Sequence, residues 1–131
     1  MRYLLALIDA EGEEQGETSP DEMQAMMEPW NEYDRELLAA GAFVAGDALQ
    51  PSVAATTVEH AQGGERIVTD GPFAETKEQI GGFYVIECEN LDDALDWARK
   101  VPVREGATVE VRPAMDFTEF GYEDPYVAKA S

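Results

Sequence analysis

The sequence predicts an α+β fold in which two helices pack on one face of an antiparallel sheet. The expected elements run strand–helix, then strands with a hairpin, then strand–helix–strand. That order is the split βαβ arrangement of ferredoxin-like folds, here with an inserted β-hairpin. A length of 131 residues is that of one domain. We therefore expect a single domain over residues 1–131, with residues 114–131 as a C-terminal extension.

The charge of the chain narrows the classes of partner. Nine Lys and Arg residues stand against 28 Asp and Glu, which gives a net charge of −19. Such a surface repels phosphate backbones and anionic lipid, so we expect no direct binding to nucleic acid or to a membrane. Acidic surfaces are also typical of proteins from high-salt habitats, and the composition is equally compatible with that origin of the negative charge.

The N-terminus and the cysteine content favour a cytoplasmic protein. Residues 1–14 hold too short an apolar run for a signal peptide or a spanning helix. Cys88 is the only cysteine, which excludes an intrachain disulfide and fits a reducing compartment.

The first element expected is a strand. Residues 2–8 form a compact apolar run, typical of a buried strand, and the acidic residues 9–18 form a loop after it. Apolar side chains alternate onto both faces of this strand, so both faces of the sheet need a cover. The helices cover one face. Because packing of two copies sheet to sheet covers the other, we expect a homodimer.

The first helix is expected over residues 20–40. Ser19 suits the N-cap, Pro20 suits the first helical position, and Glu22 completes a capping box. Apolar residues then recur at helical spacing as far as the glycine that follows. Pro29 lies inside this pattern and cannot donate to the carbonyl four residues back, so we expect a kink or a break just before it.

The middle of the chain reads as three strands. Residues 42–49 form one strand, with Gly46 and Asp47 as a bulge. Residues 53–60 and 66–69 form two more, joined by a glycine-rich hairpin turn over residues 62–65.

The chain is organised around residues 66–87. The Asp70-Gly71-Pro72-Phe73 turn ends one strand. Thr76 and Gln79 suit a small capping box over one helical turn. The next core strand is expected over Gly82–Cys88.

A second helix, a last strand and a tail complete the chain. Asn90 suits the N-cap of a helix over residues 91–101, which Pro102 ends. Residues 108–112 alternate as a strand. The acidic tail contains four aromatic residues, Phe117, Phe120, Tyr122 and Tyr126. Because these side chains favour burial, we expect the tail to dock across the dimer rather than to fray.

Four motifs, in the same order along the chain, resemble the DGPF branch of the YCII-related proteins. They are GDALQP at residues 46–51, TDGPFAETKEQIGGFYVIE at 69–87, LDDALDWA at 91–98 and VEVRPAMDF at 109–117. The resemblance implies a dimeric α/β-barrel, in which two ferredoxin-like protomers pack sheet to sheet in the bacterial cytoplasm. Some similar proteins are encoded beside, or fused to, extracytoplasmic-function sigma factors, which implies a sensing or regulatory role.

The resemblance does not carry a catalytic dyad to this chain. In the wider YCII group, an enzymatic role has been suggested from a His–Asp pair whose His belongs to the first helix. Residues 20–40 contain no histidine, and Trp30 stands near that position. Asp70 is the nearest counterpart of the Asp.

Two carboxylates are the candidate catalytic residues. Asp70 either caps its own turn or holds a carboxylate at the mouth of a pocket, where it would act as an acid or base. Asp47 has the same two interpretations. If both face one cavity, each shifts the pKa of the other.

Four further residues are candidate ligand-binding groups. Trp30, Tyr33 and Tyr84 either belong to the core or wall a pocket between the first helix and the sheet, near the Asp70 turn. Lys77 is either solvated or binds an anionic group.

The sequence predicts no metal site and no cofactor. His60 is the only histidine, and no second ligand lies at metal spacing. Carboxylates beside Cys88 disfavour its thiolate, and motifs for phosphate or nucleophilic chemistry are absent.

Three classes of function remain open. One is a small-molecule-binding or sensing dimer without turnover. The second is a small cofactor-independent enzyme that uses Asp70 or Asp47 as acid or base in a helix–sheet pocket. The third is a structural interaction module. The absent dyad favours the first.

Overall fold

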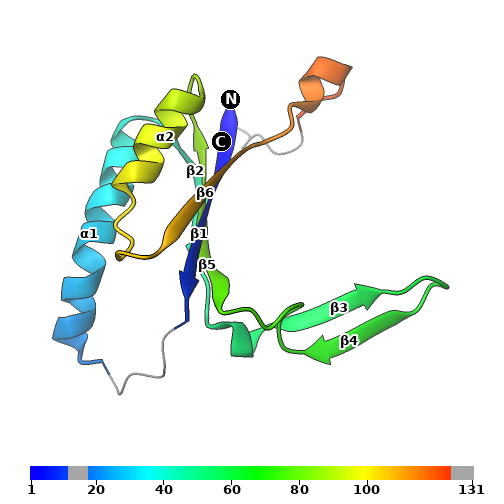
Figure 1. Cartoon of the computed structure of the whole chain (residues 1–131). Coiled ribbons are helices and arrows are strands. Elements are labelled where there is room, and N and C mark those ends of the chain that lie inside the picture. The colour runs from blue at the N-terminus through cyan, green and yellow to red at the C-terminus, as the bar shows by residue number, and fades with distance from the viewer. Residues whose placement is uncertain (12–17, 125–131) are drawn as a thin grey trace.

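The computed structural model describes residues 1–11 and 18–124 (Figure 1). Four strands form one antiparallel sheet in the order β2-β5-β1-β6, and β3 pairs with β4 in a separate two-stranded sheet. The predicted α+β, ferredoxin-like topology with an inserted hairpin is confirmed. The elements are β1 (Arg2–Ala10), α1 (Pro20–Ala39), β2 (Phe43–Ala48), η1 (Ser52–Ala54), β3 (Thr56–His60), β4 (Arg66–Asp70), β5 (Glu78–Glu87), α2 (Leu91–Lys100), β6 (Thr108–Pro113) and η2 (Phe117–Phe120).

Both α-helices cover the same face of the four-stranded sheet (Figure 1). The period-two alternation of the central strands directs Tyr3, Leu5 and Ile86 to that face, where they are almost fully buried. Tyr33 and Leu37 of α1 pack into the same cluster. The core therefore lies between the helices and one side of the sheet.

Helix α1 begins at its predicted cap and runs without interruption through its proline. The Ser19 side chain accepts a hydrogen bond from the Glu22 N–H at 3.2 Å. Of the kink or break expected just before Pro29, the break is excluded, because the helix is continuous over Pro20–Ala39. Pro29 and Ala25 are both exposed, so water can reach the Ala25 carbonyl that Pro29 leaves without an N–H donor.

The irregularity in β2 lies earlier than predicted. The register against β5 shifts between Phe43 and Ala45, while Gly46 pairs regularly with Tyr84. A Cβ atom at Gly46 would lie 2.9 Å from Cδ1 of Tyr84. Gly46 is therefore explained by the close approach of the Tyr84 ring and not by a bulge.

The segment before β5 contains no helical turn, contrary to the prediction. Strand β5 begins at Glu78, so Thr76 and Gln79 do not cap a helix. The Gln79 amide instead donates to the carbonyl oxygens of Ala74 at 3.0 Å and of Thr76 at 3.3 Å, closing the loop.

The inserted hairpin forms a distinct arm. Strand β3 starts at Thr56, three residues later than predicted, because Ser52–Ala54 form a 3-10 turn. The Glu11 carboxylate accepts from the N–H and the hydroxyl of Ser52, each at 2.6 Å, and so holds this turn beside the end of β1. Beyond the turn, β3 and β4 project away from the four-stranded sheet (Figure 1).

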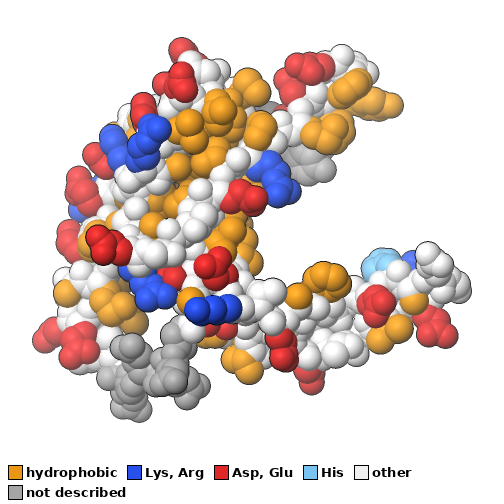
Figure 2. Space-filling model, viewed as in Figure 1, with side chains coloured by type: hydrophobic (Ala, Val, Ile, Leu, Met, Phe, Trp, Pro, Cys, Tyr) orange, Lys and Arg blue, Asp and Glu red, His pale blue; other side chains and the backbone are white. Residues whose placement is uncertain are grey.

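The second face of the sheet, which we call the open face, is not covered by either helix. Its apolar side chains, from β1 and β5, are only partly exposed in the protomer; they include Leu4, Ile8, Phe83 and Val85. The hairpin and the η2 segment extend from opposite ends of this face (Figure 1), and apolar side chains line the hollow between them (Figure 2).

The described part of the tail, residues 114–124, is attached to β1. The Ala114 N–H donates to the Arg2 carbonyl at 2.9 Å, and the Arg2 guanidinium forms a largely buried ion pair with Asp124. Phe120 and Tyr122 remain 66% and 69% exposed. Tyr126 lies outside the described residues, and docking of the tail across a dimer stays a prediction.

Within the described ranges, no helix combines the length and the apolar character that crossing a membrane requires.

Candidate functional site

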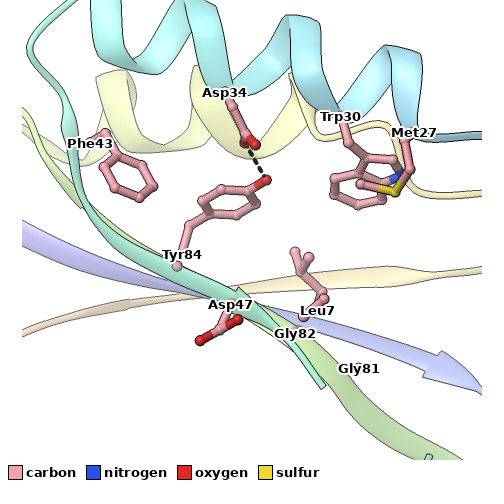
Figure 3. Close-up of a pocket in the computed structure, with 11 residues that line it drawn as sticks. Leu7, Met27, Trp30, Asp34, Phe43, Asp47, Gly81, Gly82 and Tyr84 are labelled. Atoms are coloured by element: carbon pink, nitrogen blue, oxygen red, sulfur yellow. Dashed lines mark hydrogen bonds between the residues drawn. The ribbon is translucent and has the colours of Figure 1, made fainter. Parts of the chain in front are cut away.

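A cavity of about 410 Å³ lies between α1 and the edge of the sheet formed by β2 and β5. We call it the helix–sheet pocket (Figure 3). This volume is within the usual range for small-molecule sites. The lining residues are Leu7, Met27, Trp30, Asp34, Phe43, Gly46, Asp47, Ala48, Gly81, Gly82 and Tyr84.

Helix α1 supplies one wall of the pocket. Met27, Trp30 and Asp34 are spaced by three and then four residues, so they lie on one face of the helix. The first two are large and apolar, whereas Asp34 is a half-buried carboxylate.

Small residues on β2 and β5 make the floor. Gly46 pairs with Tyr84, and Ala48 pairs with Gly82. A Cβ atom at Gly82 would lie 3.0 Å from the Asp47 carbonyl oxygen, which is tighter than an ordinary contact, so glycine suits the close approach of the two strands. Because small side chains stand opposite the bulky ones of α1, space remains between the layers.

Asp34 and Tyr84 are joined across the pocket. The Tyr84 hydroxyl donates to Oδ1 of Asp34 at 2.7 Å (Figure 3). The Tyr84 ring packs edge-on against Tyr33, with 5.2 Å between ring centroids, and against Phe43, with 6.5 Å. Burial, and then the bond to Asp34, hold the pKa of Tyr84 well above its usual value, so the phenol keeps its proton and acts as a donor.

One oxygen of the Asp34 carboxylate stays available to a ligand. Oδ1 is the oxygen that Tyr84 occupies. Oδ2 has no hydrogen-bond partner in the described part of the chain, and this oxygen is not fully buried. The site therefore offers a hydrogen-bond acceptor, oriented by Tyr84, inside walls that are mainly apolar and aromatic.

Three of the six predicted site residues line this pocket. Trp30 and Tyr84 contribute side chains, but the Asp47 carboxylate points to the opposite side of the strand (Figure 3). Its register partner Phe83 belongs to the open face as well. Tyr33 is a core residue, with its hydroxyl donating to the Trp97 carbonyl at 2.9 Å.

Asp70 lies away from the helix–sheet pocket. It is exposed at the end of β4, opposite Thr56. The turn after it is held by hydrogen bonds of 2.7 Å from the Gly71 N–H to the Ala55 carbonyl and from the Thr57 hydroxyl to the Gly71 carbonyl. The Asp70–Phe73 turn thus anchors the base of the hairpin, and Asp70 lines neither of the two cavities described here for residues 1–11 and 18–124.

A second, shallower cavity of about 560 Å³ lies at the base of the hairpin. Pro72 and Phe73 of the Asp70–Phe73 turn line it, although the Phe73 side chain is 94% exposed. Lys77 is exposed and lines neither cavity.

The remaining reactive residue types lie outside both cavities. Burial raises the pKa of the Cys88 thiol, and the nearby Asp93 carboxylate raises it further, which disfavours a thiolate. His60 is exposed and stands opposite Arg66 in the hairpin. Among residues 1–11 and 18–124, no cluster of three or more His, Cys, Asp or Glu side chains is arranged to hold a metal ion.

Asp34 is the functional candidate that sequence reasoning missed. It lies four residues after Trp30 and directly follows Tyr33, within the apolar stripe of α1. An Asp in the interior of a helix, beside its apolar face, is a poor helix former and is the signal that would have identified it.

Comparison with known proteins gives the family. The sequence model of the YCII-related domain matches residues 1–118. An uncharacterized protein of Rhizobium meliloti (strain 1021) is 44% identical over 97 residues, which cover 72% of this chain and 77% of that protein. Most of the chain, including every element of the four-stranded sheet and the whole helix–sheet pocket, falls within the matched domain. The chain therefore belongs to the YCII-related family.

Proposed function

We propose that the protein is a small-molecule-binding dimer that senses its ligand without turning it over, and that the helix–sheet pocket is its binding site. The observation that carries this proposal is the pocket of about 410 Å³ with apolar and aromatic walls and a single oriented carboxylate, Asp34. Pockets of this kind, with a few fixed polar groups in an apolar lining, are typical of specific ligand sites.

Binding without turnover is favoured by the arrangement of the titratable groups. In the Asp34–Tyr84 pair the phenol holds its proton tightly and fixes Oδ1 of the carboxylate, while Oδ2 stays available as an acceptor, so the pair is suited to recognition. The carboxylates of Asp47 and Asp70 are not directed into the pocket as an acid and base pair.

The dimer is proposed to form through the open face of the sheet. Leu4, Phe83 and Val85 are apolar and are not covered by either helix. A second copy would bury them in a sheet-to-sheet packing. The Asp70–Phe73 turn supports placing the chain in the DGPF branch, where cytoplasmic location and a sigma-factor context would fit a sensing role.

The experiment is a ligand screen read at Trp30. Two-dimensional NMR spectra of the whole chain follow the two indole N–H signals while fragments of positive, neutral and negative charge are added. The signal of Trp30, assigned with Trp30→Phe, is expected to shift, while that of Trp97 stays as an internal reference. Each binding fragment is then incubated with the protein and is expected to be recovered unchanged by mass spectrometry.

A matched pair of variants locates the site. Ala48→Leu places a larger side chain in the pocket and is expected to abolish the Trp30 shifts. Ala39→Leu adds the same atoms at an exposed position of α1 and is expected to leave them intact. Fragments that shift Trp30 equally in both variants would reject the pocket, and conversion of a bound fragment would reject the claim of no turnover.

A further inference from the structure

We propose that the helix–sheet pocket selects an organic cation with an apolar body, such as a protonated alkyl- or arylamine. This inference rests on the proposed function, because it names the class of ligand for the same pocket. It combines three features of the described residues: the charge around the pocket, the aromatic groups that line it, and the hydrogen-bonding capacity of Asp34.

The charge around the pocket is negative and is not balanced locally. Two charged residues stand among the described lining, and only Asp34 directs its carboxylate into the pocket, because that of Asp47 points to the opposite side of the strand. Arg35, the neighbour of Asp34 in sequence, turns to the exposed side of α1, where it pairs with Glu32 at 2.8 Å and Glu28 at 3.4 Å. With a net charge of −19 on the chain, the surrounding potential attracts cations and repels anions.

The aromatic lining suits a cation. Trp30, Phe43 and Tyr84 surround the carboxylate. The π-faces of such rings attract ammonium groups, and the attraction is stronger where water is partly excluded. Leu7 and Met27 supply apolar contacts for the rest of the ligand.

The charged hydrogen-bonding group of the site, Asp34, is an acceptor, and the indole N–H of Trp30 is a neutral donor among the lining side chains. An ionised carboxylate accepts hydrogen bonds and does not donate them. The Tyr84 hydroxyl already donates its hydrogen bond to Oδ1 of Asp34. The remaining oxygen is complementary to an N–H donor, and a charged donor forms the stronger bond. A ligand carboxylate or phosphate would find like charge and no cationic side chain among the described lining residues.

The test compares three probes that share a phenyl ring and differ in charge: phenethylamine, 2-phenylethanol and 3-phenylpropanoate. Each is titrated into the whole chain, and its dissociation constant is read from the Trp30 indole signal. The amine is expected to bind at least about tenfold more tightly than the alcohol, the difference that one charge-assisted hydrogen bond supplies. The propanoate is expected not to bind.

Two variants assign the preference to one carboxylate. Asp34→Asn retains an acceptor for Tyr84 but removes the charge, and it is expected to reduce amine affinity to that of the alcohol. Glu36→Gln removes an exposed carboxylate from the same helix and is expected to keep the preference. The unchanged Trp97 signal reports that each variant is folded.

The outcomes separate this inference from the proposed function. If the alcohol or the propanoate shifts Trp30 as tightly as the amine does, or if Asp34→Asn binds the amine like the parent chain, cation selection is wrong while the pocket remains a binding site. If no probe of any charge shifts Trp30, both the inference and the pocket are rejected.

Discussion

Asp34 and Tyr84 act as one unit because each satisfies the other where the helix meets the sheet. The phenol gains a strong acceptor, and the carboxylate gains a donor that fixes its orientation toward the cavity. Tyr84 is 8% exposed and packs against Tyr33, so the ring is held independently of the hydrogen bond. The orientation of Asp34 therefore depends on a ring that belongs to the core.

Removing the Tyr84 hydroxyl should weaken the fold without disrupting it. Tyr84→Phe keeps the ring packing but deletes the bond to Asp34, so we expect a loss of about 1–2 kcal/mol in the free energy of unfolding. Tyr122→Phe removes a hydroxyl from a side chain that is 69% exposed and serves as the control. Chemical denaturation measures both, and equal stability of the two variants would show that the bond contributes nothing.

Gly46 should be intolerant of any side chain. In Gly46→Ala the new Cβ would lie 2.9 Å from Cδ1 of Tyr84 and 3.1 Å from the Phe83 carbonyl oxygen, so the strands must shift. We expect a loss of about 1–3 kcal/mol, as in other overpacked sites. Gly81→Ala is the matched control, since a Cβ atom at that position would meet nothing within 4 Å. If thermal unfolding shows the same melting temperature for both, the close packing at Gly46 is not as described.

At the scale of elements, sequence signals identified helices well and loops poorly. Ser19 and Asn90 cap the two helices as predicted, because capping depends on local side-chain chemistry. The early start of β5 and the 3-10 turn before β3 were missed, because they depend on pairing with distant strands. The Pro29 break was wrong because solvent can satisfy the freed carbonyl.

One ion pair should make the connection between β1 and the α2–β6 loop sensitive to acid. Arg104 binds both carboxylate oxygens of Asp9, at 2.6 and 2.7 Å, and this hydrogen bonding, with the attraction of the guanidinium, holds the pKa of Asp9 below its usual value. A carboxyl pKa that is lower in the folded chain contributes stability above its unfolded value, and this contribution is lost as the pH falls through the folded value.

The variant Asp9→Asn tests that connection. It should be less stable than the parent chain at neutral pH, and the difference should shrink as the pH falls below the ordinary range of an aspartate. Glu65→Gln, in the exposed hairpin turn, should show no such change. Urea unfolding at several pH values measures the effect. A difference that stays constant with pH would contradict it.

At the scale of the whole molecule, the topology was predictable and the pocket was only partly so. Alternating and helical periodicities, with the order of elements, gave the βαβ arrangement and the inserted hairpin. A cavity between α1 and the sheet was expected, with Trp30 and Tyr84 in it, but the carboxylate was assigned to Asp70 or Asp47 instead of Asp34. The sequence does not reveal that β3 and β4 leave the main sheet and carry Asp70 away from α1 (Figure 1).

The open face should make the assembly vulnerable to a single charge. Val85 lies in the central strand β5 on that face, so in Val85→Asp a dimer would bury an unpaired carboxylate. We expect the parent chain to be a dimer and this variant to be a monomer at micromolar concentration, as measured by light scattering after gel filtration. Ala25→Glu, on the exposed side of α1, should remain a dimer. A monomeric parent chain, or a dimeric Val85→Asp, would reject the open face as the interface.

The central claim is that the helix–sheet pocket is the ligand site of this protein, and crystallographic fragment screening tests it most directly. Crystals of the whole chain are soaked with fragments of all three charge types, and the positions of bound fragments are compared. Fragments are expected to gather in the pocket, against Trp30 and within hydrogen-bonding distance of Asp34. Fragments that gather instead in the cavity at the hairpin base, and leave the helix–sheet pocket to water, would contradict the claim.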